Sequence, residues 1–368
     1  MCVNERYFNT LNSEMQLSIV TNLLALYGFT LYNVTRSVNE DKSKIFSSLL
    51  QFFTKGCIVM YHIIINPASR SGKGQKLWEE IVKPYLTQEK IDYIPYFSDK
   101  PGEVAELTRK LTKDATSEDP INLIILGGDG TFNETVQGIR DFSAVILGYI
   151  PTGSSNDLAR DLLIPRNTSL AVQQAFQSTN VHKMDVGLVT FEDGYSRRFT
   201  VSCGMGFDAA VCEEVNRSKF KVAFNKIGLG KLAYLAIAVK QLLTAKSVSC
   251  EMELNDKKYT MKKLLFLATM IHRYEGGGFL FGPDAIDHDG IFNLCSVRNV
   301  LPKWVILLGL PSAFWGKHYI FPGIDAFAAE KIHIKTSRPL WIHTDGEILR
   351  QDDEMTISCL KQVLQLRY

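Results

Sequence analysis

From residue 60 onward, the chain consists of short apolar runs separated by turn-forming and helical segments. Runs that are rich in Ile and Leu and lack polar alternation suit strands whose two faces are both buried. Their alternation with helical patterns predicts a parallel sheet with crossover helices. The predicted strands are 61–66, 92–96, 122–126 and 145–150, and the predicted helices are 74–85, 103–112, 132–140 and 157–162.

After residue 183 the pattern changes to shorter segments that predict antiparallel strands. We therefore expect an α/β domain over 60–183, a β-rich domain over 184–354, and a final segment, 355–368, that returns to complete the first domain. The predicted strands of the second half are 198–202, 249–254, 264–269, 292–297, 331–336 and 340–343, and one packed helix is predicted over 231–243.

Residues 1–59 show no strand–turn–helix rhythm, and a strong apolar strand follows Met60 at once. We expect this segment to be an accessory extension or to lie upstream of the true start at Met60. The alternative is an amphipathic helix that docks on the core or on a membrane, and the pattern leaves both open.

Composition narrows the class of protein. The formal net charge is +2, from 41 basic and 39 acidic residues, which argues against a nucleic-acid binder but leaves room for a local basic patch that meets anionic lipid. The seven cysteines are scattered without a C-x-x-C pair, which argues against structural zinc and disulfides and indicates a reducing cytoplasm. The apolar segment 17–34 carries several polar residues, and 304–315 is too short to span a bilayer.

Three loops that follow predicted strands carry residues suited to phosphate binding. The first, 66–74, reads Asn-Pro-Ala-Ser-Arg-Ser-Gly-Lys-Gly, and the second, 127–134, reads Gly-Gly-Asp-Gly-Thr-Phe-Asn-Glu. The third, 151–160, places hydroxyl side chains and a glycine before Asn156 and Asp157. Small residues at a helix start leave backbone N–H groups free to bind an anion. Each loop alone could be a turn or a cap, but three at successive strand ends predict one crevice.

With these residues in view, the chain resembles the diacylglycerol kinase catalytic-domain family, which includes sphingosine kinases and soluble bacterial lipid kinases. The Gly127–Thr131 run is shared with NAD kinases and phosphofructokinases, whereas Asn156–Arg160 has the lipid-kinase form. The later motifs Asp185-Val-Gly187, Gly230–Tyr234, Asp287–Gly290 and Asp345-Gly-Glu347 also resemble the family. The insertion of Ser69-Arg70 departs from its Asn-Pro-x-Ser-Gly pattern and leaves open which serine meets the phosphates.

The resemblance implies a Rossmann-like (NAD kinase/diacylglycerol kinase-like) nucleotide-binding domain followed by a C-terminal β-sandwich domain. It implies ATP bound by Asn66, Pro67, Ser71, Gly72, Ser98, Gly128, Asp129, Gly130, Thr131, Asn133, Glu134, Ser154 and Asp157. It also implies Mg²⁺ organised by Asp129, Asp157 and Asp185, and a second, structural Mg²⁺ held by Asp289 and the backbone carbonyls near Ile286 and Ile291.

For the general base, the resemblance favours the Asp345-Gly346-Glu347 motif, with Asp345 first and Glu347 as its rival. On its own, an Asp-Gly pair predicts a hairpin turn. The histidines His62, His182, His272 and His288 show no zinc spacing and are interpreted as surface or packing residues. Aromatic and apolar residues that could line an acceptor site are Met205, Phe207, Phe279, Phe281 and Trp315.

The predicted function is that of an ATP-dependent lipid kinase that converts diacylglycerol to phosphatidic acid. It would be cytoplasmic and peripheral at the inner face of the membrane, with no nucleic-acid partner, and a homodimer is compatible with it. Two alternatives stay open: a kinase of the same superfamily that phosphorylates NAD, a sphingoid base or another lipid, and a non-catalytic nucleotide-binding regulator.

Overall fold

Isoleucine and leucine fill the strands of the first sheet. In β1 (Tyr61–Ile65) and β3 (Ile121–Gly127) the central side chains are fully buried, and β4 (Val145–Pro151) is nearly so. With β2 (Tyr93–Phe97) these strands pair in parallel in the order β2-β1-β3-β4, which confirms the four predicted strands. The computed structural model describes residues 59–217 and 230–368, so the predicted extension up to residue 58 lies outside the described residues.

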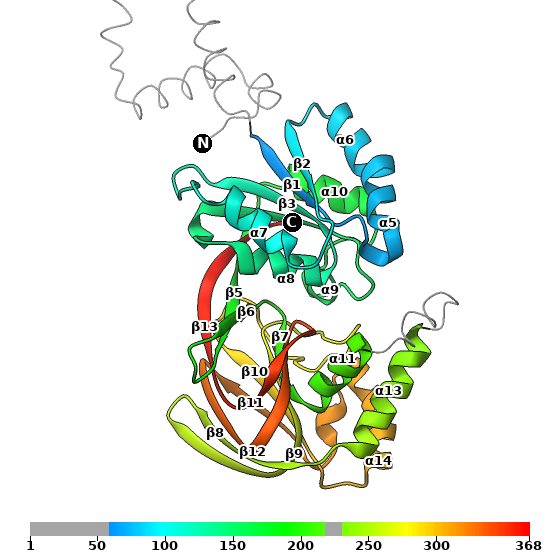
Figure 1. Cartoon of the computed structure of the whole chain (residues 1–368), viewed down its shortest axis with the longest axis vertical. Coiled ribbons are helices and arrows are strands. Elements are labelled where there is room, and N and C mark those ends of the chain that lie inside the picture. The colour runs from blue at the N-terminus through cyan, green and yellow to red at the C-terminus, as the bar shows by residue number, and fades with distance from the viewer. Residues whose placement is uncertain (1–58, 218–229) are drawn as a thin grey trace, which may run out of the picture. The chain divides into compact units, whose positions relative to one another are not determined.

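Helices connect and flank these strands (Figure 1). Two of them begin earlier than predicted, because the small-residue loops form their first turns. The helix α5 (Ser69–Leu77) begins at residue 69 instead of 74, and α8 (Asp129–Gly138) begins at residue 129 instead of 132. The sequence pattern did not predict the helix α10 (Thr168–Gln177). The remaining helices of this half are η1 (Trp78–Val82, a π-helix), α6 (Lys83–Gln88), α7 (Glu103–Leu111), η2 (Phe142–Ala144), α9 (Asp157–Asp161) and α10 (Thr168–Gln177).

The second half is built from antiparallel strands, as predicted. They are β5 (Val181–Thr190), β6 (Ser196–Phe199), β7 (Ser202–Gly206), β8 (Val248–Leu254), β9 (Lys257–Met270), β10 (Phe292–Arg298), β11 (Ile324–Ala329), β12 (Lys331–Thr344) and β13 (Glu347–Arg367). The predicted single strand 198–202 is wrong, because β6 ends at Phe199 and β7 begins at Ser202. The predicted segments 331–336 and 340–343 are one strand with an irregular register.

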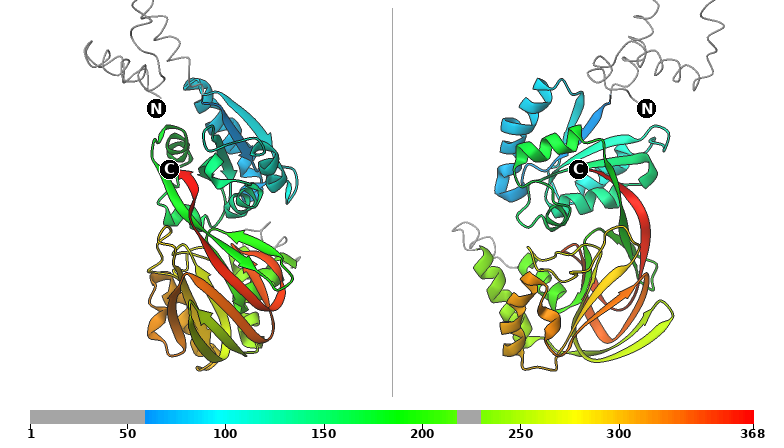
Figure 2. Two further views of the ribbon diagram at one scale, coloured as in Figure 1. Left: turned by 90° about the vertical axis from the view of Figure 1, so that its left-hand side faces the viewer. Right: turned by 180° about the vertical axis from the view of Figure 1, so that it is seen from behind.

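Helices cover one side of this β-rich half. They are α11 (Phe207–Arg217), α13 (Gly230–Thr244), which confirms the predicted packed helix, α14 (Lys303–Gly309), η3 (Leu310–Trp315) and η4 (His318–Ile320). In Figures 1 and 2, α13 and α14 lie side by side, and a cluster of buried residues that includes Leu242, Phe266 and Val297 lies beneath them. Among the described residues, no helix is both long and apolar enough to cross a bilayer.

The long strand β13 joins the two halves. It pairs antiparallel with β12 and β5 along most of its length, and its end, Gln365–Arg367, pairs in parallel with Ile146–Gly148 of β4. Figure 2 shows it running from the lower sheet to the upper one. The parallel sheet and the antiparallel strands are therefore continuous, and the sequence-distant ends of β3, β4 and β12 are held in one framework.

Candidate active site

Two carboxylates meet where the second and third loops approach each other. Asp129 begins α8 and Asp157 begins α9, and the backbone N–H of Asp157 donates to Oδ2 of Asp129 over 3.2 Å. The loops touch backbone to backbone, because a Cβ on Gly153 would lie only 2.8 Å from Cα of Gly128. Glycine at both positions is what allows this approach.

The electrostatics of this pair are unfavourable in the absence of a cation. Asp129 keeps some exposed surface, but its carboxyl is enclosed by protein, and this desolvation, together with the charges of Asp157 and Asp345, raises its pKa to about 7. Burial also raises the pKa of Asp157, although Arg160 (3.2 Å) and the N–H of Gly277 (2.7 Å) contact its carboxylate. A site of like charges with shifted pKa values is typical of a functional centre.

Asp345 reaches the same region from the β12–β13 turn. Its carboxylate accepts hydrogen bonds from Asn133 Nδ2 (2.7 Å) and from four further donors at 2.8–3.0 Å: the N–H and hydroxyl of Thr200 and the N–H groups of Val201 and Ser202. Asp345 and Gly346 both have positive φ (49° and 82°), so the motif is also the predicted hairpin turn. These donors explain why the chain leaves the strand geometry between β6 and β7.

Glu347 begins β13 and faces the second loop. Its Oε1 lies 3.5 Å from the position that a Cβ on Gly130 would occupy. Among its described neighbours, no hydrogen bond to the Glu347 carboxylate is present, in contrast to the heavily bonded carboxylate of Asp345. The site thus holds one anchored and one uncommitted carboxylate, two residues apart.

The first loop is tied to the other two through side chains. Asn66 Nδ2 donates to Thr131 Oγ1 over 2.9 Å, and the hydroxyls of Ser69 and Thr152 are 2.7 Å apart. Both residues lie in the predicted phosphate loops, although neither was among the predicted nucleotide-binding residues. Gly72 has φ of 88°, Pro67 O accepts the N–H of Gln75, and the Ser71 side chain lies outside the described part of the chain.

The other predicted nucleotide residues border this crevice less directly. Ser98 is buried and lies at the end of β2, where its hydroxyl donates to Ile65 O (3.3 Å), and Ser154 is exposed on the third loop. Glu134 Oε2 accepts the N–H of Gly102 (3.0 Å), which ties α8 to the loop that precedes α7.

Residues 60–189 match the family model of the diacylglycerol kinase catalytic domain, and residues 201–367 match that of the YegS C-terminal NAD kinase beta sandwich-like domain. The chain belongs to the diacylglycerol kinase catalytic-domain family. Membership of this family identifies the protein as a phosphotransferase of the lipid kinase type. The two matches also agree with the predicted α/β domain and C-terminal β-sandwich domain.

Curated relatives agree with this family assignment, and a solved structure agrees with the fold. A diacylglycerol kinase of Bacillus subtilis is 28% identical over 290 residues, which span 77% of this chain and 88% of that protein. One from Staphylococcus carnosus is 27% identical, over 77% of this chain and 87% of its own length. The fold resembles the crystal structure of a Bacillus anthracis diacylglycerol kinase with a TM-score of 0.61 at 19% identity, over 84% of this chain and 97% of that one.

Asp185, a further predicted member of the carboxylate cluster, makes its described contacts with another loop. Its carboxylate accepts the N–H groups of Gly290 (2.6 Å) and Gln362 (2.7 Å), so it ties the 287–291 loop to β13. Among the described residues, it forms no hydrogen bond with the loops that carry Asp129 and Asp157. Its place in a Mg²⁺ cluster with these two carboxylates stays a prediction.

The predicted structural Mg²⁺ loop is the one that Asp185 contacts. Asp289 Oδ1 accepts the N–H of Ile291 over 2.8 Å, and the side chain of Ile286 is half exposed. The role of this loop as a metal site stays a prediction.

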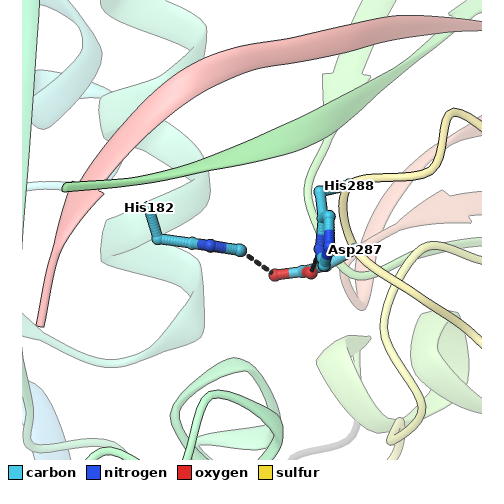
Figure 3. Close-up of side chains that lie close together, drawn as sticks. All are labelled: His182, Asp287 and His288. Carbon is cyan, nitrogen blue, oxygen red and sulfur yellow. Dashed lines mark hydrogen bonds and ion pairs between the residues drawn. The ribbon is translucent and has the colours of Figure 1, made fainter. Parts of the chain in front are cut away.

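Beside this loop, two histidines share one carboxylate (Figure 3). His182 Nε2 lies 2.7 Å from Oδ2 of Asp287, and His288 Nδ1 lies 2.6 Å from Oδ1, which lowers the pKa of Asp287, against its partial burial, and raises that of His288. The three ligand atoms are close enough for a metal ion, but each carboxylate oxygen already has an imidazole partner. Both histidines were predicted to be surface or packing residues, and these contacts describe a packing role: they fasten the loop to β5.

A buried histidine, His343, lies beside the β12–β13 turn. His343 Nε2 is 3.2 Å from both Asp208 Oδ2 and Glu275 Oε1, and the N–H of Gly346 donates to its Nδ1 over 3.2 Å. The residue links the start of α11 and the 275–278 glycine loop to the turn that presents Glu347. Sequence spacing gave no sign of this cluster, because its members come from three distant segments.

An apolar cavity lies next to this cluster, between the β9–β10 face and the helices that cover it. Of the residues predicted to line an acceptor site, Phe207 and Phe281 line this cavity, whereas Met205 is a core residue, Phe279 stacks outside the cavity and Trp315 is exposed. His318 also lines it, and burial lowers the pKa of this imidazole to about 4, so it is neutral at physiological pH. Neither ring nitrogen of His318 has a hydrogen-bond partner among the described residues.

Proposed function

We propose that this kinase transfers the γ-phosphate of ATP to the hydroxyl of diacylglycerol and forms phosphatidic acid. The observation that carries the proposal is that an uncommitted carboxylate, Glu347, faces the phosphate-loop residue Gly130. The apolar cavity lies close to the β12–β13 turn: Phe207 lines the cavity, and the next residue, Asp208, contacts His343, which bonds the turn. Relatives that are named diacylglycerol kinase support the choice of acceptor.

The three loops and the helix starts of α5, α8 and α9 would hold the triphosphate. Backbone N–H groups at Gly128 and Gly130, at the start of α8, would bind phosphate oxygens, as is common at helix N-termini. The N–H of Gly72 donates to Ala68 O instead. In this proposal, residues 60–183 with the segment 355–368 form the nucleotide-binding domain. Residues 184–354 then supply the lipid site and the catalytic residues.

The residues present fit Mg²⁺. Two adjacent carboxylates, Asp129 and Asp157, share a desolvated position. Burial raises the pKa of both, the charge of Asp157 raises that of Asp129 further, and a divalent cation would stabilise their ionised forms. Mg²⁺ binds through one or two carboxylates plus phosphate oxygens and water, which matches this pair. When bound, it would neutralise the charge that develops on the transferred phosphoryl group.

For the base, the geometry favours Glu347 over our first choice, Asp345. Five donors occupy the lone pairs of the Asp345 carboxylate, and a proton on it would break several of these hydrogen bonds. Glu347 carries no such commitment among the described residues. Asp345 is therefore assigned the role of positioning the turn, and Glu347 that of accepting the proton of the acceptor hydroxyl.

The resulting step is balanced without further reactants. The hydroxyl oxygen of the lipid attacks the γ-phosphorus as Glu347 takes its proton, and the bond between the γ-phosphorus and the β–γ bridging oxygen breaks. The products are phosphatidic acid and ADP, and the proton leaves Glu347 to solvent. Positioning by the loops and charge stabilisation supply most of the rate enhancement in such a reaction.

The test is an acceptor panel in mixed micelles with Mg²⁺ and γ-labelled ATP. We expect the label to enter an organic-phase product with diacylglycerol and to exceed that with monoacylglycerol, a sphingoid base or NAD. Label in an aqueous product would favour the NAD kinase alternative, and ATP binding without transfer to any acceptor would favour a regulator. Either result would overturn the proposal.

The proposal includes the place of action. A soluble ATP-using kinase with a membrane-resident acceptor would act from the cytoplasm as a peripheral protein at the inner face of the membrane. A homodimer is compatible with it, and size-exclusion chromatography with light scattering would determine the assembly.

A further inference from the structure

Large apolar side chains extend into solvent along α14, η3 and η4. Trp304 and Leu308 lie one turn apart on α14 and are 62% and 73% exposed, and Trp315 and Ile320 are 70% and 75% exposed. We call the surface formed by Trp304, Leu308, Phe314, Trp315 and Ile320 the apolar face. Contiguous exposed apolar side chains of this size mark interaction sites in soluble proteins, whereas isolated ones do not.

The opposite side of the same elements is apolar as well. Ile306, Gly309 and Leu310 line the cavity beneath them. Helical segments that are hydrophobic on all sides are usually buried in a core or in a membrane. The inner side of these helices lines the cavity. Their exposed outer side is therefore suited to a second apolar environment, outside the protein.

The charge of the surrounding segment indicates which environment this is. Residues 299–323 contain Lys303, Lys317 and His318 and no carboxylate, and Lys317 is exposed. The Nζ of Lys303 donates to the carbonyls of Leu243 (2.7 Å) and Ala245 (2.6 Å), which brings the half-exposed Leu243 at the end of α13 to the same edge. Tryptophan beside lysine, without acidic residues, is typical of segments that lie in the headgroup region of an anionic bilayer.

A row of aromatic rings leads from this face to the cavity. Phe314 stacks on Phe279 with ring centroids 4.2 Å apart, and Phe279 stacks on Phe281 at 5.5 Å. Phe281 lines the cavity, and Phe279 follows the glycine loop whose Gly277 binds Asp157. An apolar route therefore connects the solvent-exposed face with the neighbourhood of the reacting groups.

We propose that the apolar face docks on the surface of an anionic bilayer, and that the lipid acceptor passes from the bilayer into the cavity along the aromatic row. This inference rests on the proposed lipid acceptor. It goes further by assigning the membrane-binding surface to α14, η3 and η4, with the side chains of the two tryptophans and Leu308 inserted at headgroup depth and Lys317 near the phosphates.

The binding test uses the full chain and sedimentation with phosphatidylcholine vesicles that contain phosphatidylglycerol. Trp315→Ala and Leu308→Gln are each expected to weaken vesicle binding about tenfold, which corresponds to about 1.4 kcal/mol, and Lys317→Gln is expected to reduce the dependence on phosphatidylglycerol. The matched control is Leu170→Gln on α10, which is 52% exposed but far from the apolar face in sequence and fold. It should bind as the wild type does.

An activity measurement separates docking from catalysis. On long-chain diacylglycerol in vesicles, the Trp315→Ala/Leu308→Gln double variant should lose activity in parallel with binding. On a short-chain diacylglycerol dissolved as monomers, it should retain wild-type turnover. Wild-type binding by the double variant, or failure of the wild type to bind the anionic vesicles, would overturn the docking proposal.

Two further outcomes are distinguishable. A wild-type chain that binds vesicles through this face but phosphorylates no lipid would overturn the proposed function while the docking surface stands. A wild-type dimer in size-exclusion chromatography that the double variant dissociates, with vesicle binding unchanged, would assign the face to a second copy of the chain and overturn the docking proposal.

Discussion

Asp345 and Glu347 are two residues apart, yet their surroundings give them different chemistry. The carboxylate of Asp345, in the β12–β13 turn, accepts five hydrogen bonds. The carboxylate of Glu347 faces the loop around Gly130. A carboxylate whose lone pairs are occupied by backbone donors is a structural anchor. One that faces the reacting groups without such donors is able to take a proton.

Exchange of these two carboxylates for amides should therefore have different effects. Glu347→Gln should lower kcat about 10²- to 10⁴-fold and leave the melting temperature unchanged. Asp345→Asn should lower both, because an amide nitrogen cannot accept from the N–H groups of Val201 and Ser202, at a cost of about 1–3 kcal/mol. Kinetics and thermal unfolding of the two variants decide between them; full activity of Glu347→Gln would refute the assignment.

The raised pKa of Asp129 should make the stability of the protein depend on pH and on divalent cations. Its pKa is about 7 in the folded protein against an ordinary value of 3.8, so the folded state holds this proton more tightly than the unfolded state does. In the absence of divalent cations, the contribution of Asp129 to stability therefore falls as the pH rises from about 4 to about 7 and stays low above that. Asp129→Asn removes this penalty.

We expect Asp129→Asn to have the higher melting temperature at pH 8 in EDTA and to match the wild type near pH 4. Mg²⁺ should raise the melting temperature of the wild type at pH 8 and affect the variant much less, and kinase activity should be lost in the variant. Equal Mg²⁺ responses of the two proteins would show that the cation does not bind at Asp129.

At the residue scale, the sequence identified most of the carboxylates but not their partners. Asp129 and Asp157 were predictable from glycine-rich motifs at strand ends, whereas only the family resemblance singled out Asp345, whose Asp-Gly pair otherwise predicts a hairpin turn. The contacts of Asp185 were not predictable, because its partners Gly290 and Gln362 come from segments 105 and 177 residues away. The same distance in sequence hid the networks of His343 and Asp287.

At the element scale, the joint between the second and third loops is the most constrained part of the site. Gly128 and Gly153 approach so closely that a methyl group on either one would contact the other's Cα at 3.0 Å or less. This contact sets the distance between the starts of α8 and α9, and thus the distance between Asp129 and Asp157.

Gly153→Ala should push the two loops apart. We expect the KM for ATP to rise several-fold and the protein to lose about 1–3 kcal/mol of stability, as overpacking generally causes. Isothermal titration with a non-hydrolysable ATP analogue and chemical denaturation would measure both. Unchanged nucleotide affinity together with reduced stability would indicate that the loops bind no phosphate.

At this scale, the pattern of apolar residues predicted which helices and strands exist better than it predicted where they begin and end. The Ile- and Leu-rich strands of the parallel sheet were predictable because both faces are buried. The starts of α5 and α8 were not, because serine, glycine and aspartate resemble a loop until their amides form a helix turn. The break between β6 and β7 was also hidden, since its cause, Asp345, lies 145 residues after Thr200.

At the scale of the whole molecule, β13 makes the two halves depend on each other. The fully buried Leu366 packs in the core of the parallel sheet, although its strand begins at Glu347 beside the β12–β13 turn. Damage near residue 366 should therefore weaken the α/β half directly and the β12–β13 turn indirectly.

Leu366→Ala is expected to cost about 2–5 kcal/mol, because it leaves a cavity in a packed core. The control Val181→Ala alters a 37%-exposed side chain on β5 and should change stability by less than about 0.5 kcal/mol. Urea denaturation followed by circular dichroism measures both. Equal midpoints for the two variants would mean that the final strand contributes little to the sheet.

The long separation in sequence between β4 and its partner β13 also governs the order of events during synthesis. Until residues 365–367 leave the ribosome, β4 has its partner β3 on one side only and an open edge on the other. Open edges recruit other strands, so the growing polypeptide is exposed to misassembly while the residues between β4 and the end of β13 are made. Only a chain that already includes residues 365–367 is able to complete the sheet.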